Sequence, residues 1–268
     1  MAGEYYYLIS SLPDISIAYE HAKAFPGFFE FCREQMKPAD FKNLRKCFLF
    51  NDIQNVCKFK KEGDVYQSPS YYDKEDFLEN LADPDRFLPF ISGFFYDRSK
   101  EVKRFPGMPG IDELLWRFYE TLDDIAGGFV RDYFLFELNL RNYCAALSLR
   151  TRGLEYKKKI IGSDYFSGQI AHSSAPDFGL GGEFSDFAPL LETFGKAGPL
   201  ELEKTIEDIR FHWLDEAVSY RYFSAEAVCA LAIKLNSAER WLKLDPEKGR
   251  EILDEILARA KGSLKKAE

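Results

Sequence analysis

The stretch RDYFLFELNLRNYCAALSLRTRGLEYKKKII, residues 131–161, carries the clearest helical pattern in the chain. Four of its large apolar residues are spaced four, three and four positions apart: Phe136, Leu140, Tyr143 and Leu147. This spacing places them on one face of a helix. The stretch has no proline, and Gly153 follows the last turn, where a left-handed C-cap forms most easily. The pattern predicts a helix over residues 129–152, roughly 36 Å long at 1.5 Å per residue, which needs packing partners along its whole length.

The rest of the chain repeats this helical spacing between proline and glycine breaks. We expect further helices at residues 28–35, 39–59, 85–95, 115–125, from Pro199 through Trp213, after Ser224, and at residues 245–262. Asn51 and Asp52 interrupt the second of these patterns, and Pro89 is expected to bend the third. Residues 163–184 are rich in Ser, Gly and Asp, and predict a long irregular loop. Strand-like alternation is nearly absent, so the sequence predicts an all-α fold.

Composition excludes several classes of protein. The net charge of −8 argues against a nucleic-acid-binding protein, which normally has a basic face. No run approaches 18 apolar residues, and the first residues lack the basic region of a signal peptide, so we expect a cytoplasmic protein. Five cysteines without a CxxC spacing suit reduced, buried thiols. Aromatic residues, at 16%, either fill the core or serve interfaces.

No short catalytic motif is present: the sequence has no Walker A run, no GxGxxG, no HExxH and no GxSxG. The three histidines lie far apart and have no carboxylates at metal-ligand spacing. The acidic pairs sit where solvated helix faces are expected. The sequence therefore predicts no catalytic, cofactor-binding or metal-binding residues.

Polar residues inside apolar helices are more informative. Asn139, Arg141 and Asn142 interrupt the middle of the central helix, and Glu239 and Arg240 do the same near the end of the chain. Buried amides and guanidinium groups are costly unless they are hydrogen-bonded. These residues therefore either pair with another helix of the same chain or face a partner protein. The basic stretch 150–159 is either solvated or in contact with lipid headgroups.

A short pattern recurs in the two halves of the chain. Asn55-Val56-Cys57 has FLF upstream at residues 48–50, and Asn142-Tyr143-Cys144 has FLF upstream at residues 134–136. A third copy would be KLNSAERWLKL, residues 234–244. The pattern indicates an internal repeat.

Three segments carry a resemblance to a known family: ELNLRNYCAALSLRTRGLEYKKKIIG at residues 137–162, YYYLISSLP at residues 5–13, and YFSAEAVCALAIKLNSAERWLKLDPEKG at residues 222–249. The first resembles the middle repeat of the C subunit of prokaryotic V/A-type ATPases, which corresponds to the d subunit of the eukaryotic V-type ATPase. More closely, the whole chain resembles an uncharacterised bacterial family thought to take the place of that subunit.

The resemblance implies three pseudo-repeated helical lobes arranged as a funnel, here at residues 1–105, 106–184 and 185–268. It implies a non-catalytic rotor subunit that joins the central shaft of a V/A-type ATPase to the membrane proteolipid ring, attached to the cytoplasmic membrane through the complex and without a cofactor. Within the matching segments, Glu137, Arg141, Asn142 and Arg240 are the residues expected to bind the partner. Two alternatives stay open: a helical scaffold unrelated to ATPases, and an enzyme that uses residues 163–184 as a lid.

Overall fold

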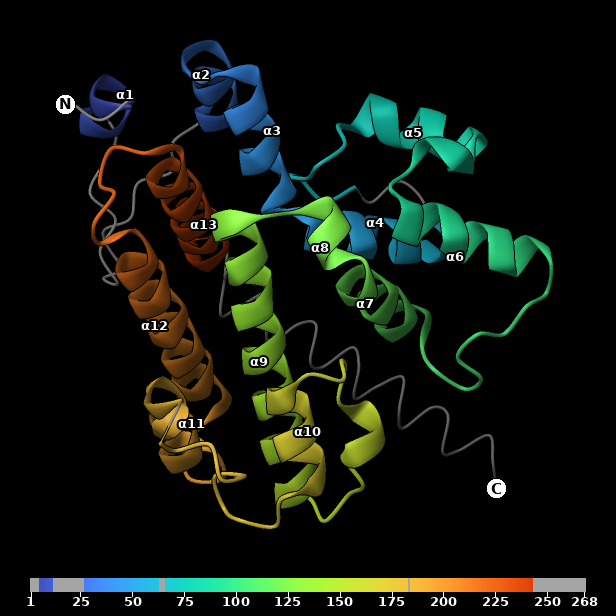
Figure 1. The fold of residues 1–268 in the computed structure, drawn as a ribbon, viewed down its shortest axis with the longest axis vertical. Coiled ribbons are helices and arrows are strands. Elements are labelled where there is room, and N and C mark those ends of the chain that lie inside the picture. The colour runs from blue at the N-terminus through green and yellow to red at the C-terminus, as the bar shows by residue number, and fades with distance from the viewer. Residues whose placement is uncertain (1–4, 12–26, 63–65, 183, 243–268) are drawn as a thin grey trace.

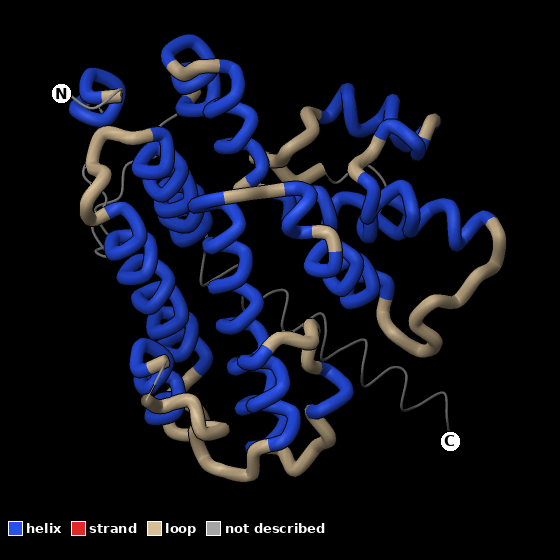
Figure 2. The backbone as a smooth tube through the Cα atoms, in the orientation of Figure 1, coloured by secondary structure: helices blue, strands red, loops and turns tan. Residues whose placement is uncertain are grey.

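The computed structural model describes residues 5–11, 27–62, 66–182 and 184–242 (Figure 1). These residues form thirteen α-helices, three short 3-10 helices and no strand (Figure 2), which confirms the predicted all-α class. The α-helices are, in chain order, α1 (Tyr6–Ser10), α2 (Phe28–Gln35), α3 (Pro38–Lys46), α4 (Leu49–Glu62), α5 (Lys74–Ala82), α6 (Pro89–Ser99), α7 (Gly110–Glu120), α8 (Leu122–Ile125), α9 (Gly128–Thr151), α10 (Tyr165–His172), α11 (Ala188–Thr193), α12 (Pro199–Val218) and α13 (Ala225–Leu242). The 3-10 helices are η2 (Pro84–Arg86), η3 (Lys157–Lys159) and η4 (Ser185–Phe187).

Helix α9 is the predicted central helix and runs through the middle of the molecule (Figure 1). Its ends lie within one residue of those predicted. Gly153, two positions after the last helical residue, has a φ of +67°. Glycine adopts this left-handed conformation without the steric penalty of a Cβ atom, and the chain can therefore turn sharply there.

Two apolar cores lie along α9. Its first turns, with Val130 and Phe134, enter a core that also contains side chains from α2, α3, α4, α6, α7 and α13. Its later turns, with Leu140 and Leu147, enter a second core with α10, α11 and residues 178–187. Trp213 of α12 is partly buried and packs against both cores. The length of α9 is therefore matched by packing along both of its halves.

Several predicted helices are confirmed. Helix α2 has the predicted bounds, α12 begins at Pro199, and α13 begins just after Ser224, whose Oγ accepts a hydrogen bond from the Ala227 N–H at 3.3 Å. The helix predicted at residues 245–262 lies outside the described residues.

The helix predicted over residues 39–59 is wrong in one respect, because two helices occupy this stretch. Helices α3 and α4 meet at Cys47 and Phe48, both buried. Asn51 and Asp52 do not interrupt the pattern; they lie inside α4 and are buried. Their polar groups face the loop at residues 67–72, whose backbone they bind.

The prediction for residues 85–95 also needs correction. Residues 84–86 form the 3-10 helix η2, and the α-helix α6 begins at Pro89 instead of bending there. Leu88 has an extended backbone with a ψ of 149°. A residue before proline is pushed out of the helical conformation, whereas proline itself is well tolerated in the first turn.

Residues 163–184 are not the irregular loop that their composition predicts. They contain α10, whose N-cap Asp164 accepts a hydrogen bond from the Ser167 N–H at 2.7 Å. Beyond α10, Phe178 and Leu180 are buried in the second core. The pattern was hidden because only a few large apolar residues, widely spaced among Ser and Gly, anchor the segment. Among the described residues, no helix combines the length and apolar character needed to cross a bilayer.

Candidate functional site

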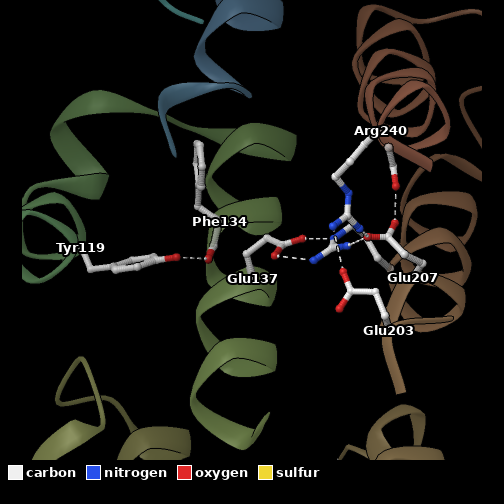
Figure 3. A network of polar contacts seen from close by, with 8 residues as sticks. Tyr119, Phe134, Glu137, Glu203, Glu207 and Arg240 are labelled. Carbon is white, nitrogen blue, oxygen red and sulfur yellow. Dashed lines mark hydrogen bonds and ion pairs between the residues drawn. The ribbon is translucent and has the colours of Figure 1, made fainter. Parts of the chain in front are cut away.

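A network of charged side chains joins α9, α12 and α13 (Figure 3). Arg210 of α12 donates to both carboxylate oxygens of Glu137 on α9, one of them at 3.1 Å, and also donates to Glu207. Glu137 and Arg210 are mostly buried, with 11% and 18% of their side chains exposed, and Glu207 is buried. This bidentate pairing is the strong geometry for a guanidinium and a carboxylate, and it fixes α12 against the middle of α9.

Arg240 of α13 extends the network. Its two terminal nitrogens donate to Glu203 at 2.8 Å and to Glu207 at 2.7 Å, both on α12 (Figure 3). Ser237, one turn earlier on α13, donates its hydroxyl to the second oxygen of Glu207. The buried carboxylate of Glu207 therefore accepts hydrogen bonds from α12 and from α13.

The charges in this network nearly balance, since two guanidinium groups face three carboxylates. Burial alone would lower the pKa of Arg210, but Glu137 and then Glu207 outweigh it and hold the pKa above its ordinary value. Arg210 is therefore charged at any physiological pH. Because each buried charge depends on the others for compensation, we expect the removal of one member to be costly.

Asn142 forms a second buried link, in the middle of α9. Its amide donates to the carbonyl of Ile161 at 2.7 Å and accepts from the N–H of Ile161 at 3.0 Å. Ser167 completes the link by accepting from Asn142 at 3.2 Å and donating to Ile161 at 3.0 Å. Asn142 has no exposed surface. It ties the start of the 163–184 segment to the central helix.

Asn55 of α4 uses its amide in the same way. It donates to the carbonyl of Gln67 at 3.0 Å and accepts from the N–H of Gln67 at 2.7 Å. Asn55 and Asn142 are the two asparagines that the Asn-X-Cys pattern aligned, and both lie at 0% exposure. Each asparagine thus binds the backbone of one residue in a later loop, Gln67 for Asn55 of α4 and Ile161 for Asn142 of α9. The third asparagine of the pattern, Asn236, lines a cavity of about 250 Å³ beside α13.

The four predicted partner-binding residues are therefore placed in two regions. Glu137 and Arg240 belong to the charged network, whereas Asn142 and Arg141 lie farther along α9. Arg141 donates to Asp112 of α7 at 2.8 Å, and 31% of its side chain is exposed. All four make contacts within the chain. This agrees with the alternative that they pair with another part of the same chain, rather than only facing a partner protein. Binding of a partner stays a prediction, and Arg141 and Arg240 have the exposed surface that it needs.

Sequence reasoning named neither Arg210 nor Glu207 of the network, and it also missed the burial of Arg117 and Asp52. Arg117 of α7 is 4% exposed and binds Asp97 and Glu113, with its Nη2 at 2.6 Å and 2.8 Å. Glu113, four positions earlier, was the available signal. Asp52 is fully buried and accepts from the N–H groups of Tyr71 and Tyr72 at 2.7 Å and 3.2 Å. No local sequence pattern predicts the burial of Asp52, because the residues that donate to it follow it by about twenty positions.

The chemistry available to these groups is structural pairing. In the described part of the chain, no cluster of three or more His, Cys, Asp and Glu side chains is arranged to hold a metal ion. Burial raises the pKa of the Cys32 and Cys144 thiols to about 12, so both stay protonated and weakly nucleophilic at neutral pH.

Two further cavities lie near these residues. One, of about 330 Å³, lies between residues 106–109 and η3, with Asp112 and Lys159 in its wall. The other, of about 300 Å³, lies between α9, η4 and α12, and aromatic side chains line it. Arg141 binds Asp112 and the carbonyl of Lys159 beside the first cavity, so this predicted residue lies next to an accessible hollow.

The relatives of the chain were found in chlamydiae. An uncharacterised protein of Chlamydia muridarum (strain MoPn / Nigg) is 23% identical over 181 residues, covering 66% of this chain and 66% of the relative. An uncharacterised protein of Chlamydia pneumoniae is 28% identical over 132 residues, covering 48% of this chain and 49% of the relative. The chain thus spans about two thirds of the first relative's length and about half of the second's. No solved structure matches the chain.

The family resemblance expected from the sequence is wrong. Neither chlamydial relative is described as part of an ATPase. The family model that matches covers residues 1–263 and is not that of the ATPase family expected from the sequence. In the described residues, the three segments that suggested the resemblance lie largely on α1, α9 and α13, and helical spacing with an Asn and an Arg recurs in unrelated helices. Because the match extends over nearly the whole chain, the chain belongs to the family described as "Protein of unknown function (DUF2764)".

Proposed function

We propose that this chain is a non-catalytic, stiff helical subunit that connects other proteins in a larger assembly. The charged network of Glu137, Arg210, Glu207 and Arg240 is the observation that carries the proposal. It links three long helices through hydrogen bonds between charged groups, which are about twice as strong as neutral ones. Sliding one helix past another would break several of these bonds and leave buried charges unpaired. Such a body suits the transmission of force.

The polar groups of the described residues also support a non-catalytic role. A general base needs a substrate within hydrogen-bond reach, but Glu137 and Glu207 are occupied by arginines and Asn142 by backbone. The 163–184 segment does not resemble a lid, because opening it would expose Phe178, which is fully buried. These arrangements favour a connecting role over an enzyme.

The specific assembly that we propose is a rotary V/A-type ATPase, with the chain between the central shaft and the proteolipid ring at the cytoplasmic face of the membrane. The shared use of Asn55 and Asn142 supports a relationship between two helical units. A rotor of this kind would be served by three such units around an opening, with the bounds 1–105, 106–184 and 185–268.

Co-purification tests this proposal. The full chain, carrying an affinity tag, is expressed together with the shaft proteins and the proteolipid ring of an ATPase from the same organism. We expect a stoichiometric complex that survives size exclusion. Arg141→Ala and Arg240→Ala, with melting curves measured alongside, separate a loss of binding from a loss of folding. Arg86→Ala, in an exposed pair with Glu79, is the control.

The possible outcomes differ clearly. Absence of the wild-type chain from both shaft and ring complexes would remove the ATPase proposal, and capture of other proteins instead would point to an unrelated scaffold. Nucleotide hydrolysis by the purified chain that one point substitution abolishes would overturn the non-catalytic role.

A further inference from the structure

The cavity between α9, η4 and α12 has an unusual wall, which we name the aromatic groove. Four rings form it: Phe136 of α9, Trp213 of α12, and Phe184 and Phe187 beside and within η4. The Phe136 and Trp213 rings are stacked, with centroids 4.8 Å apart and planes 14° from parallel. Phe184 and Phe187 are stacked at 6.2 Å and 21°, and Phe136 lies 6.0 Å from Phe187. The rings therefore pack as one cluster beside a cavity of about 300 Å³, in which Phe136 and Phe187 are buried and Phe184 and Trp213 are partly exposed.

Acidic groups lie along the same cavity. Asp132 of α9 and Asp186 of η4 both contribute to its wall and are exposed. Asp132 approaches a cation only at 3.6 Å, from Arg131, whose closer partner is Asp123. Asp186 makes no ion pair with any described residue. The aromatic groove therefore carries negative charge that the chain itself compensates only in part.

Asn139 adds an acceptor that lacks a donor. It lies one turn after Phe136 in the cavity wall, and its Oδ1 is buried without a hydrogen-bond partner among the described residues. A buried carbonyl without a donor costs free energy. A donor brought by another molecule, with rotation of the amide toward the cavity, would remove this cost. The groove thus combines aromatic faces, two carboxylates and an unused acceptor.

We propose that the aromatic groove binds an arginine side chain of a partner protein. A planar guanidinium stacks on aromatic rings and carries five N–H donors. It can therefore stack on the rings while it donates hydrogen bonds to the carboxylates and to the Asn139 amide oxygen. A lysine ammonium is a compact, strongly hydrated charge that cannot stack in this way. The cavity, at about 300 Å³, lies at the lower end of the volumes of small-molecule sites, so it has room for one side chain. The inference rests on the proposed connecting function, because a partner protein must supply the arginine.

A titration of the full chain tests the groove without any identified partner. The probe is the peptide acetyl-Gly-Arg-Gly-amide, and the observable is the ¹⁹F resonance of fluorinated Trp213. The two other tryptophans, Trp116 and Trp241, lie outside the wall of this cavity. Trp213→Phe identifies the resonance. The matched probe is the same peptide with citrulline, which keeps the shape of arginine and lacks its charge.

We expect saturable shifts with the arginine peptide and at least tenfold weaker binding of the citrulline peptide. The double variant Asp132→Asn/Asp186→Asn should weaken arginine binding at least fivefold. Asp85→Asn is the matched control: like Asp186, Asp85 is an exposed aspartate on a 3-10 helix, and it lies away from the groove. It should leave the affinity unchanged.

Equal binding of the citrulline peptide would show a merely apolar groove, and an equal effect of Asp85→Asn would show unspecific charge attraction. Either result overturns the inference, as does a lysine peptide that binds as tightly as arginine. If the double variant does not fold, the comparison of peptides on the wild-type chain decides alone. If the titration fails and the co-purification succeeds, only the proposal that the groove binds arginine is overturned. If the titration succeeds and the co-purification fails, only the ATPase proposal is overturned.

Discussion

Asn142 and Asn139 lie one turn apart on α9 and differ in what their amides find. Asn142 binds both backbone groups of Ile161, while the Oδ1 of Asn139 has no donor in the described part of the chain. The sequence indicated that both needed partners, but it left open whether these were internal. Ile161 is nineteen positions from Asn142, and only the tertiary fold brings them together. Local pattern predicted the need of these amides for partners and could not predict which partners they meet.

Asn142→Ala should therefore destabilise the chain far more than Asn139→Ala. Loss of the Asn142 amide leaves the buried N–H of Ile161 without a partner and its carbonyl with only the Ser167 hydroxyl, which lowers the free energy of unfolding by about 2 kcal/mol. Asn139→Ala should leave it unchanged or raise it, since no hydrogen bond is lost and a buried unpaired oxygen is removed. Both variants gain the same helix propensity, so urea denaturation of the pair compares the amides directly. Equal destabilisation would contradict the structural role of Asn142.

Asp52 gives the stability of the chain a pH dependence. Burial raises the pKa of its carboxyl from 3.8 to about 7, although the N–H groups of Tyr71 and Tyr72 act in the opposite direction. Between pH 3.8 and 7 the folded state holds a proton that the unfolded state has lost, so this group's contribution to stability falls as pH rises.

From pH 5 to pH 7 the loss amounts to about 2 kcal/mol in the free energy of unfolding. The measurement is urea denaturation of wild type and Asp52→Asn at both pH values. The variant cannot titrate at this position, so the wild type should lose stability relative to it. A difference that is constant, or that grows in favour of the wild type toward pH 7, would show that Asp52 titrates normally.

At the scale of elements, the sequence predicted helices best where a cap or a break is local. Gly153, Pro199 and Ser224 mark ends that the structure confirms within about one residue. It failed where an end depends on distant groups. Helices α3 and α4 separate at Cys47 and Phe48, ahead of buried Asp52 and Asn55, whose backbone partners lie in the loop beyond α4. No residue between α3 and α4 carries a local sequence signal for this break.

The charged network between α9, α12 and α13 should make a large contribution to the association of these helices. Arg210→Leu leaves the buried carboxylate of Glu137 without its arginine and removes one of the donors to Glu207, and we expect a loss of about 3–5 kcal/mol in the free energy of unfolding. Arg86→Leu removes the same charge from an exposed pair with Glu79 and should cost under about 1 kcal/mol.

Urea denaturation of the two variants checks this difference, with circular dichroism confirming that both fold. The double variant Glu137→Leu/Arg210→Leu should recover part of the loss, because it removes the uncompensated carboxylate of Glu137 as well. If Arg210→Leu costs no more than Arg86→Leu, the network does not hold the helices together in solution.

At the scale of the whole molecule, the fold class followed from helical spacing, but the arrangement of the cores did not. The predicted apolar stripe of α9, from Phe136 to Leu147, enters only the second core, whereas Phe134, which lies outside that stripe, enters the first. The aromatic groove was equally hidden, since its rings come from three segments, at positions 136, 184–187 and 213. A high aromatic content indicated that some rings serve interfaces, without showing which ones.

The shared helix predicts that the two cores unfold together. Residues of α9 contribute to both, and Trp213 packs against both, so loss of either core removes packing from the same helix. Phe77→Ala in the first core and Phe178→Ala in the second each delete a fully buried ring and should lower stability by about 3–5 kcal/mol. Each should shift one common transition, in the way that cooperative domains behave. The exposed ring of Tyr96 supplies the control Tyr96→Ala, which should leave the transition in place.

Hydrogen exchange followed by mass spectrometry distinguishes common from separate unfolding. In both variants, the amides of α4 in the first core and α10 in the second should lose protection by the same free energy, because the opening that exposes them is global. If Phe178→Ala weakened protection only in α10 and the second half of α9, the cores would open independently. The central helix would then act as a flexible joint, and stiff connection between other proteins would no longer be a tenable function for this chain.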